Sequence, residues 1–213
     1  MKKIIYLSAA IMLAAACHKA PSQLDKDGEY LVYTSRAEGT DFSAYKTYNI
    51  PDSLLIIGQS AKPEYSKSTY SLALIDQYKK MMNSYGYVYT DDKDAADLGI
   101  QVTYIIETEN YVNYISDPYW WLDYPGYWHP GYWGQWTGWN YGYPVVYSFS
   151  TNSLITEIVD LTAEDGTGTP LPILWTSYIG GPKGGSIHSD VLKLKLAIGQ
   201  SFSQSQYLDQ SGR

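Results

Sequence analysis

Cys17 is the residue whose type and position predict a specific chemical modification. It is the only cysteine in the 213-residue chain. Ahead of it stand Lys2 and Lys3, an apolar run over residues 4–13 and alanines at 14–16, which is the pattern of an export signal and its cleavage site. A cysteine directly after such a site is where a lipoprotein precursor is cut and acylated. We therefore expect residues 1–16 to be removed and Cys17 to carry acyl chains.

Two other interpretations of this segment are open. Common lipoprotein signals place a branched apolar residue three positions before the cysteine, where this chain has Ala14, so an ordinary signal peptide is one alternative. A membrane-spanning anchor is the other, although the apolar run is shorter than the ~20 residues that cross a bilayer. We favour a membrane partner reached through acyl chains on Cys17. The expected location is the cell envelope, at the outer membrane.

A second group of residues with binding chemistry is the aromatic tract over residues 117–144. It contains six of the seven tryptophans, and its proline and glycine residues leave no helical or strand period. The residues that we expect to contact a ligand or partner are Trp120, Trp121, Trp128, Trp133, Trp136, Trp139, Tyr132 and Tyr141. Loops of this length in compact domains are usually functional or disordered.

Four interpretations of the tract compete. Its rings can stack on sugar faces, settle at a lipid–water interface or form the hot spots of a protein interface. A self-packing loop that binds nothing specific is the fourth. We favour a non-catalytic module that presents the tract to an envelope protein partner. A glycan-binding protein or glycoside hydrolase that uses the same tract is the alternative.

The histidines do not indicate catalysis. His188, Ser189 and Asp190 are adjacent, whereas catalytic triads are assembled from residues that meet in space, so capping of a helix by Ser189 or Asp190 is the better interpretation. His129 lies inside the aromatic tract beside Pro130, and we interpret it as a surface or stacked imidazole.

The carboxylates do not indicate catalysis either. A glycosidase needs two of them, and the candidates are Glu107, Glu109, Glu157, Asp160, Glu164 and Asp165. Strand alternation would place Glu107 and Glu109 on one face but Glu157 and Asp160 on opposite faces. No pair stands out, so we expect no catalytic residues, no enzyme activity and no cofactor.

The sequence indicates neither metal nor nucleic-acid binding. Asp91, Asp92, Asp94 and Asp97 cluster around Lys93, but the glycine and terminal glutamate of a calcium loop are missing, which favours a solvated turn. With its one thiol acylated, the chain has no thiolate for a metal or for nucleophilic catalysis. The formal net charge of −7 disfavours nucleic acid and anionic lipid headgroups as partners. We therefore expect no metal site.

The elements that position these residues follow from apolar periodicity. Strands are predicted over residues 29–34, 45–50, 87–89, 98–106 and 173–179, a β-hairpin over 145–150 and 154–161, and helices over 66–84 and 189–205. In the first helix, Ser68 is the expected N-cap and Gly86 the C-terminal glycine. The strand over 98–106 alternates as expected for one buried face.

This order of elements predicts an α+β fold. We expect a mainly antiparallel sheet with two helices packed on one face and a long aromatic Gly/Pro-rich insert loop. After the signal peptide, residues 17–28 are the expected tether, and residues 29–207 the expected single domain.

Five segments also form an ordered pattern. Residues 41–48 read DFSAYKTY, 84–87 read SYGY, 95–102 read AADLGIQV, 152–161 read NSLITEIVDL and 175–180 read WTSYIG, with the aromatic tract in the middle. This order resembles an uncharacterised family of bacterial envelope lipoproteins, a domain of unknown function. The family has a D-F-x-x-Y-K-T-Y start, an A-D-L-x-V strand and an aromatic-rich insert. The resemblance implies an α+β envelope domain and carries no catalytic residues.

Overall fold

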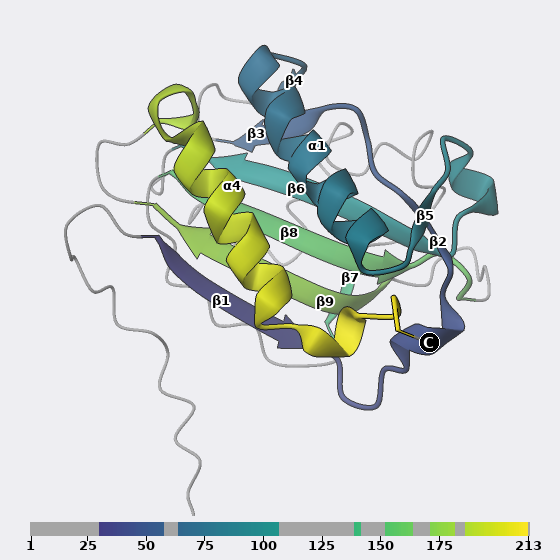
Figure 1. Cartoon of the computed structure of the whole chain (residues 1–213). Coiled ribbons are helices and arrows are strands. Elements are labelled where there is room, and N and C mark those ends of the chain that lie inside the picture. The colour runs from purple at the N-terminus through teal and green to yellow at the C-terminus, as the bar shows by residue number, and fades with distance from the viewer. Residues whose placement is uncertain are drawn as a thin grey trace, which may run out of the picture.

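The computed structural model describes residues 30–57, 64–106, 139–141, 152–163, 171–181 and 186–212. These residues form one mixed β-sheet with helices α1 and α4 packed side by side on one of its faces (Figure 1). The predicted α+β class is therefore confirmed. Most of the aromatic insert lies outside the described residues.

Four long strands form the antiparallel part of the sheet. They are β1 (Leu31–Arg36), β9 (Leu171–Gly180), β8 (Ser153–Asp160) and β6 (Leu98–Ile105), in that spatial order. The registers place Ile100 opposite Ile158, and Ile158 opposite Trp175. Both edges of β8 are thus occupied, so the predicted hairpin between β8 and residues 145–150 is wrong, although residues 145–150 themselves lie outside the description.

Shorter strands complete the sheet. They are β2 (Thr47–Asn49), β3 (Leu54–Ile57), β4 (Glu64–Ser66), β5 (Val88–Tyr89) and β7 (Trp139–Tyr141). Strands β2 and β3 both pair in parallel with β6, along the edge that β8 does not occupy. On their outer edges, β2 pairs with β5 and β3 pairs with β4. β3 and β4 were not expected from the sequence, because each is only three or four residues long and lacks room for a clear alternation.

The helices begin and end at capping residues. Helix α1 (Thr69–Ser84) starts at Ser68, whose hydroxyl accepts a hydrogen bond from the Ser71 N–H at 3.1 Å, as predicted. After α1 the chain turns at Gly86, which has φ of +91°; a Cβ there would lie 3.1 Å from the backbone of Gln210. Helix α4 (Ile187–Ser203) starts at Ser186 rather than at the expected Ser189 or Asp190. Three short 3₁₀ helices are η1 (Phe42–Ala44), η2 (Lys93–Ala95) and η4 (Gln206–Leu208).

The main core lies between the sheet and the helices. Trp175 of β9 and Tyr78 of α1 both pack against Phe202 of α4, with ring centroids 5.6 and 6.3 Å from that of Phe202. The Trp175 indole N–H donates to Ser205 Oγ at 2.9 Å, which satisfies the buried donor. The prediction that β6 buries only one face is wrong: every residue of β6 is buried, because this strand is paired on both edges and shielded on both faces.

Candidate functional site

Most of the site residues predicted from the sequence lie outside the described part of the chain. These are Cys17, Trp120, Trp121, Trp128, Tyr132, Trp133 and Trp136, together with His129 and the carboxylates of Glu107, Glu109, Glu164 and Asp165. Trp139 and Tyr141 belong to β7, whose backbone pairs in parallel with residues 171–173 of β9.

Strands β6 and β7 are the described elements before and within the aromatic insert, and they meet the sheet at opposite ends. Strand β6 ends at Ile105, opposite Ser153. Strand β7 pairs with the first residues of β9, at the opposite end of the sheet. An eight-residue strand spans about 26 Å, so residues 106–138 connect two points separated by roughly the length of the sheet.

Polar side chains occupy the centre of the sheet face turned away from α1 and α4, which we call the reverse face. Gln101 of β6, Glu157 of β8 and Thr176 of β9 are direct neighbours across the three strands. Thr156, one position from Glu157, donates its hydroxyl to Tyr78 of α1, so strand alternation turns Glu157 towards the reverse face. We call these three residues the polar row.

The polar row is buried. Glu157 is only 3% exposed, and Gln101 and Thr176 are equally inaccessible. A buried carboxylate is costly unless its oxygens accept hydrogen bonds or meet a cation, and none of the three residues is without a partner. Close by on the same face, the hydroxyls of Ser153 and Tyr178 lie 3.1 Å apart. The carboxylate, amide and hydroxyl of the polar row are therefore hydrogen-bonding groups that the folded domain closes off from solvent.

Glu157 does not form a catalytic pair with Asp160. Asp160 lies opposite Leu98 on the helix side and accepts a hydrogen bond from the Tyr45 hydroxyl at 3.0 Å. The burial of Tyr45 and, next, the adjacent Asp160 raise the pKa of this phenol well above its usual value. The prediction that Glu157 and Asp160 face opposite sides of the sheet is confirmed. Because the sheet lies between the two carboxylates, they cannot act as an acid–base pair on one glycosidic bond.

His188 and its neighbours cap a helix. The His188 ring lies edge-on to Tyr70 of α1, with centroids 4.4 Å apart. Ser186 and Ser189 form a reciprocal capping box, and Asp190 Oδ2 accepts a hydrogen bond from the Ser186 N–H at 2.9 Å. The capping interpretation is confirmed, with Ser186 as the N-cap.

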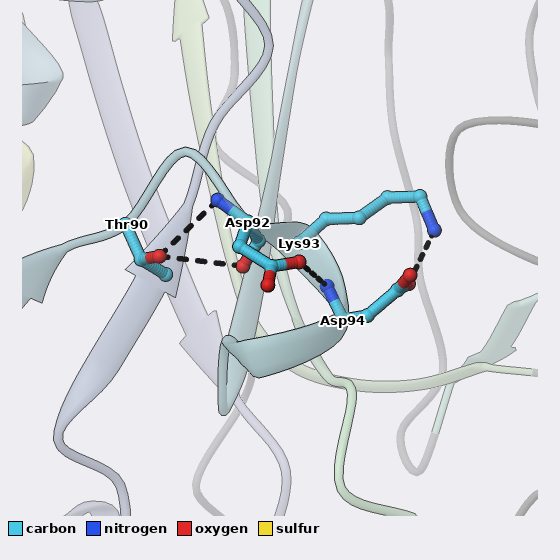
Figure 2. Close-up of polar contacts among 4 residues, drawn as sticks. All are labelled: Thr90, Asp92, Lys93 and Asp94. Atoms are coloured by element: carbon cyan, nitrogen blue, oxygen red, sulfur yellow. Dashed lines mark hydrogen bonds and ion pairs between the residues drawn. The ribbon is translucent and has the colours of Figure 1, made fainter.

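The acidic cluster is a hydrogen-bonded turn around η2 (Figure 2). Asp92 Oδ1 accepts from the Asp94 N–H at 3.1 Å, and the Asp94 carboxylate pairs with Lys93 Nζ. These residues are largely exposed, as expected for a solvated turn. Within the described ranges, no group of three or more His, Cys, Asp or Glu side chains is arranged to hold a metal ion.

Asp97 has a different role from the rest of that cluster. Its carboxylate accepts hydrogen bonds from the N–H groups of Lys46 and Thr47, at 2.6 and 2.8 Å, and so joins β2 to the start of β6. Partial burial by itself would raise the pKa of Asp97, but these donors outweigh it and hold the pKa below its ordinary value.

A second buried polar group joins the start of β1 to α4. The Tyr30 phenol interacts with Asp190, and burial together with this carboxylate raises the pKa of Tyr30 well above its usual value. Asn152, which has φ of +63°, accepts a hydrogen bond from the Tyr104 hydroxyl at 3.4 Å beside this group. The arrangement fixes the N-terminal end of the domain next to the N-terminus of α4.

Sequence reasoning counted Glu157 among several carboxylates and did not single it out. The available signal was its context: together with Thr156, it lies between two apolar pairs of strand residues, Leu154–Ile155 and Ile158–Val159. A charged residue in such a run either marks an exposed face or is buried with partners. Only the burial of the reverse face in the folded domain distinguishes these two cases.

The fold and these contacts define a class of protein, an α+β domain with a mixed sheet and helices on one face. Residues 32–205 match the family model DUF4136, a domain of unknown function. The chain belongs to this family, which confirms the resemblance at the level of an uncharacterised domain.

A solved structure supports the assignment. The chain is 44% identical to a DUF4136 family protein of known crystal structure from Bacteroides thetaiotaomicron, with a TM-score of 0.74, covering 86% of this chain and 99% of that one. A search of the curated proteins gave no match. Among the described residues, no helix is both long and apolar enough to span a bilayer.

Proposed function

We propose that this protein is a lipid-anchored, non-catalytic domain of the bacterial cell envelope that presents its aromatic insert to a protein partner. The observation that carries the proposal is the single cysteine at the end of an export signal. Acyl chains on Cys17 would hold the domain at the outer membrane, with residues 17–28 as the tether.

Two features support a binding role for the insert. It concentrates six of the seven tryptophans within residues 117–144, and tryptophan and tyrosine dominate interface hot spots. The segment between β6 and β7, which carries five of these tryptophans, is attached at opposite ends of the sheet. A sheet that holds both attachment points of a binding segment lowers the conformational entropy that the segment loses on binding.

The proposal of a non-enzyme is supported by the roles of the described candidate residues. Ser186, Ser189 and Asp190 are occupied in capping α4, and Asp160 is occupied by Tyr45. Glu157 lies on the opposite face from Asp160. A glycan-binding role remains the alternative because tryptophan faces also stack on sugar rings.

The lipid anchor is tested by the mass of the protein extracted from membranes. We expect a chain that begins at residue 17 and carries acyl chains, and a Cys17→Ser variant that no longer sediments with membranes. Cys17 with a free thiol, or an intact Met1, would overturn the anchor.

The partner is tested by photo-crosslinking in intact cells. A photoreactive phenylalanine in place of Tyr132 should form an adduct with a discrete envelope protein. The same replacement at Tyr65, an exposed tyrosine of β4, is the matched control and should not. Oligosaccharides that shift tryptophan fluorescence while Tyr132 forms no protein adduct would favour glycan binding instead.

A further inference from the structure

The outer side of α4 exposes two leucines one turn apart. Leu192 and Leu196 are 74% and 77% exposed, more than any other large apolar side chain in the described ranges. Leu194, Ile198 and Phe202 of the same helix are buried against the sheet, so the exposed pair projects on the opposite side of α4. Figure 1 shows α4 beside α1 on one face of the sheet.

The charged side chains next to these leucines are basic. Lys193 is exposed and Lys195 is partly exposed, whereas the helix's one carboxylate, Asp190, is buried against Ser186 and Tyr30. The chain as a whole has a net charge of −7. This side of α4 therefore carries positive charge, although the net charge of the chain is negative. Anionic headgroups would be attracted to this side.

The chain leaves the described domain beside α4. Tyr30, the first described residue, interacts with Asp190 in the first turns of the helix. Its ring also lies 3.0 Å from where a Cβ on Gly181 would be, close to the helix start. From Cys17 to Tyr30 the chain can extend at most about 45 Å, and a flexible chain of this length spans about 20 Å on average. A lipid on Cys17 would therefore keep the N-terminal half of α4 near the bilayer.

We propose that this side of α4, comprising Leu192, Lys193, Lys195 and Leu196, lies on the membrane surface that anchors Cys17. The leucines enter the boundary between headgroups and acyl chains, and the lysines face anionic headgroups, as in interfacial amphipathic helices. This inference rests on the lipid anchor proposed above. It adds an orientation: the sheet stands over the bilayer with α4 beneath it.

The test uses the acylated full chain, in which an introduced cysteine is the only reactive thiol. Leu196→Cys is labelled with an environment-sensitive fluorophore and reconstituted into vesicles of phosphatidylethanolamine and phosphatidylglycerol. Val88→Cys is the matched control, because Val88 is 62% exposed but lies on β5, away from α4. Lipids with a nitroxide in the upper acyl chain should quench the dye at position 196 and leave the dye at position 88 unquenched.

The outcomes separate the two proposals. If each chain carries one dye and the protein stays with the vesicles, the anchor holds. Equal quenching at both positions, or no quenching at position 196, would then overturn docking alone. Two dyes per chain would show that the Cys17 thiol is free. This result, with the protein in the supernatant, would overturn both the anchor and docking. A Lys193→Gln/Lys195→Gln double variant should lower the ratio of docked to undocked protein by about fivefold for each lysine. In phosphatidylcholine vesicles the lysine changes should have little effect.

Discussion

The two faces of the sheet are built from alternate residues of the same strands and bury different chemistry. On the helix side, Trp175, Tyr78 and Phe202 form an aromatic core in which the Trp175 indole donates to Ser205 and the Tyr78 hydroxyl accepts from Thr156. On the reverse face, Gln101 and Glu157 lie in the middle of the sheet, equally inaccessible to solvent. Apolar burial stabilises the first face directly, whereas the second gains stability only if every polar atom keeps its partner.

This difference indicates where stability and function compete in the fold. The helix side is explained by packing alone, because its residues match the apolar stripes of α1 and α4. A carboxylate in the centre of a sheet is not needed for packing, and an apolar residue there would avoid the cost of desolvation. The polar row is therefore the part of the described domain where a binding role would affect stability most.

The largest expected effect is on the helix side. Trp175→Ala should lower the free energy of unfolding by about 3–5 kcal/mol, because it leaves a cavity beneath Phe202 and removes the donor to Ser205. Urea denaturation of the full chain measures this loss. Tyr33→Ala, at a tyrosine that is 38% exposed on the neighbouring strand β1, is the control and should cost less. Similar losses for both variants would contradict the assignment of the core.

The second expected effect concerns the reverse face. Glu157→Gln should lower the free energy of unfolding by about 1–3 kcal/mol, because the groups that accommodate the buried carboxylate would meet a neutral amide. Glu64→Gln on the exposed strand β4 is the matched control and should be neutral. A more stable Glu157→Gln variant would show that the carboxylate is held at a cost, as expected of a binding residue.

A smaller effect is expected where β2 meets β6. Asp97→Asn should cost about 1–2 kcal/mol at neutral pH, because the charged acceptor of the Lys46 and Thr47 N–H groups is lost. The folded-state pKa of Asp97 lies below the ordinary value of 3.8, so its stabilisation is present above that value and is lost as the pH falls through the folded-state pKa. The difference between the two proteins should therefore shrink below about pH 4. Asp91→Asn, in the exposed turn, is the matched control and should change the free energy of unfolding little at neutral pH.

The smallest expected effect is a gain. Ser177 is fully buried on the helix side of β9, and its hydroxyl has no hydrogen-bond partner in the described part of the structure. Ser177→Ala should raise the free energy of unfolding by about 0.5–1 kcal/mol, because it removes an unsatisfied polar atom. Ser203→Ala, at an exposed position of α4, is the reference and should change little. A destabilised Ser177→Ala variant would indicate that this hydroxyl has a partner.

The long elements could be predicted from the sequence because each carries its own periodic signal. The stripe of Leu74, Ile75, Tyr78 and Met82, with Ser68 before it and Gly86 after it, was enough to place α1. Strands β3 and β4 have no comparable signal, and they form because β6 and each other offer edges to pair with. The N-cap of α4 is Ser186 rather than Ser189 or Asp190, because Ser186 and Ser189 form a reciprocal capping box in which Ser189 is the third helical residue.

The sequence by itself determined the class of fold, the expected cleavage and acylation at Cys17, and the aromatic insert, because local patterns of residue type carry these signals. Only the tertiary structure decided that β8 is enclosed by β6 and β9 and that Glu157 lies in a buried polar row. It also decided that Leu192 and Leu196 of α4 face outward and that Tyr30 lies against Asp190 at the start of this helix. Strand order and helix placement depend on contacts between residues far apart in the chain. The residue pattern of one segment does not specify which other segments pack against it.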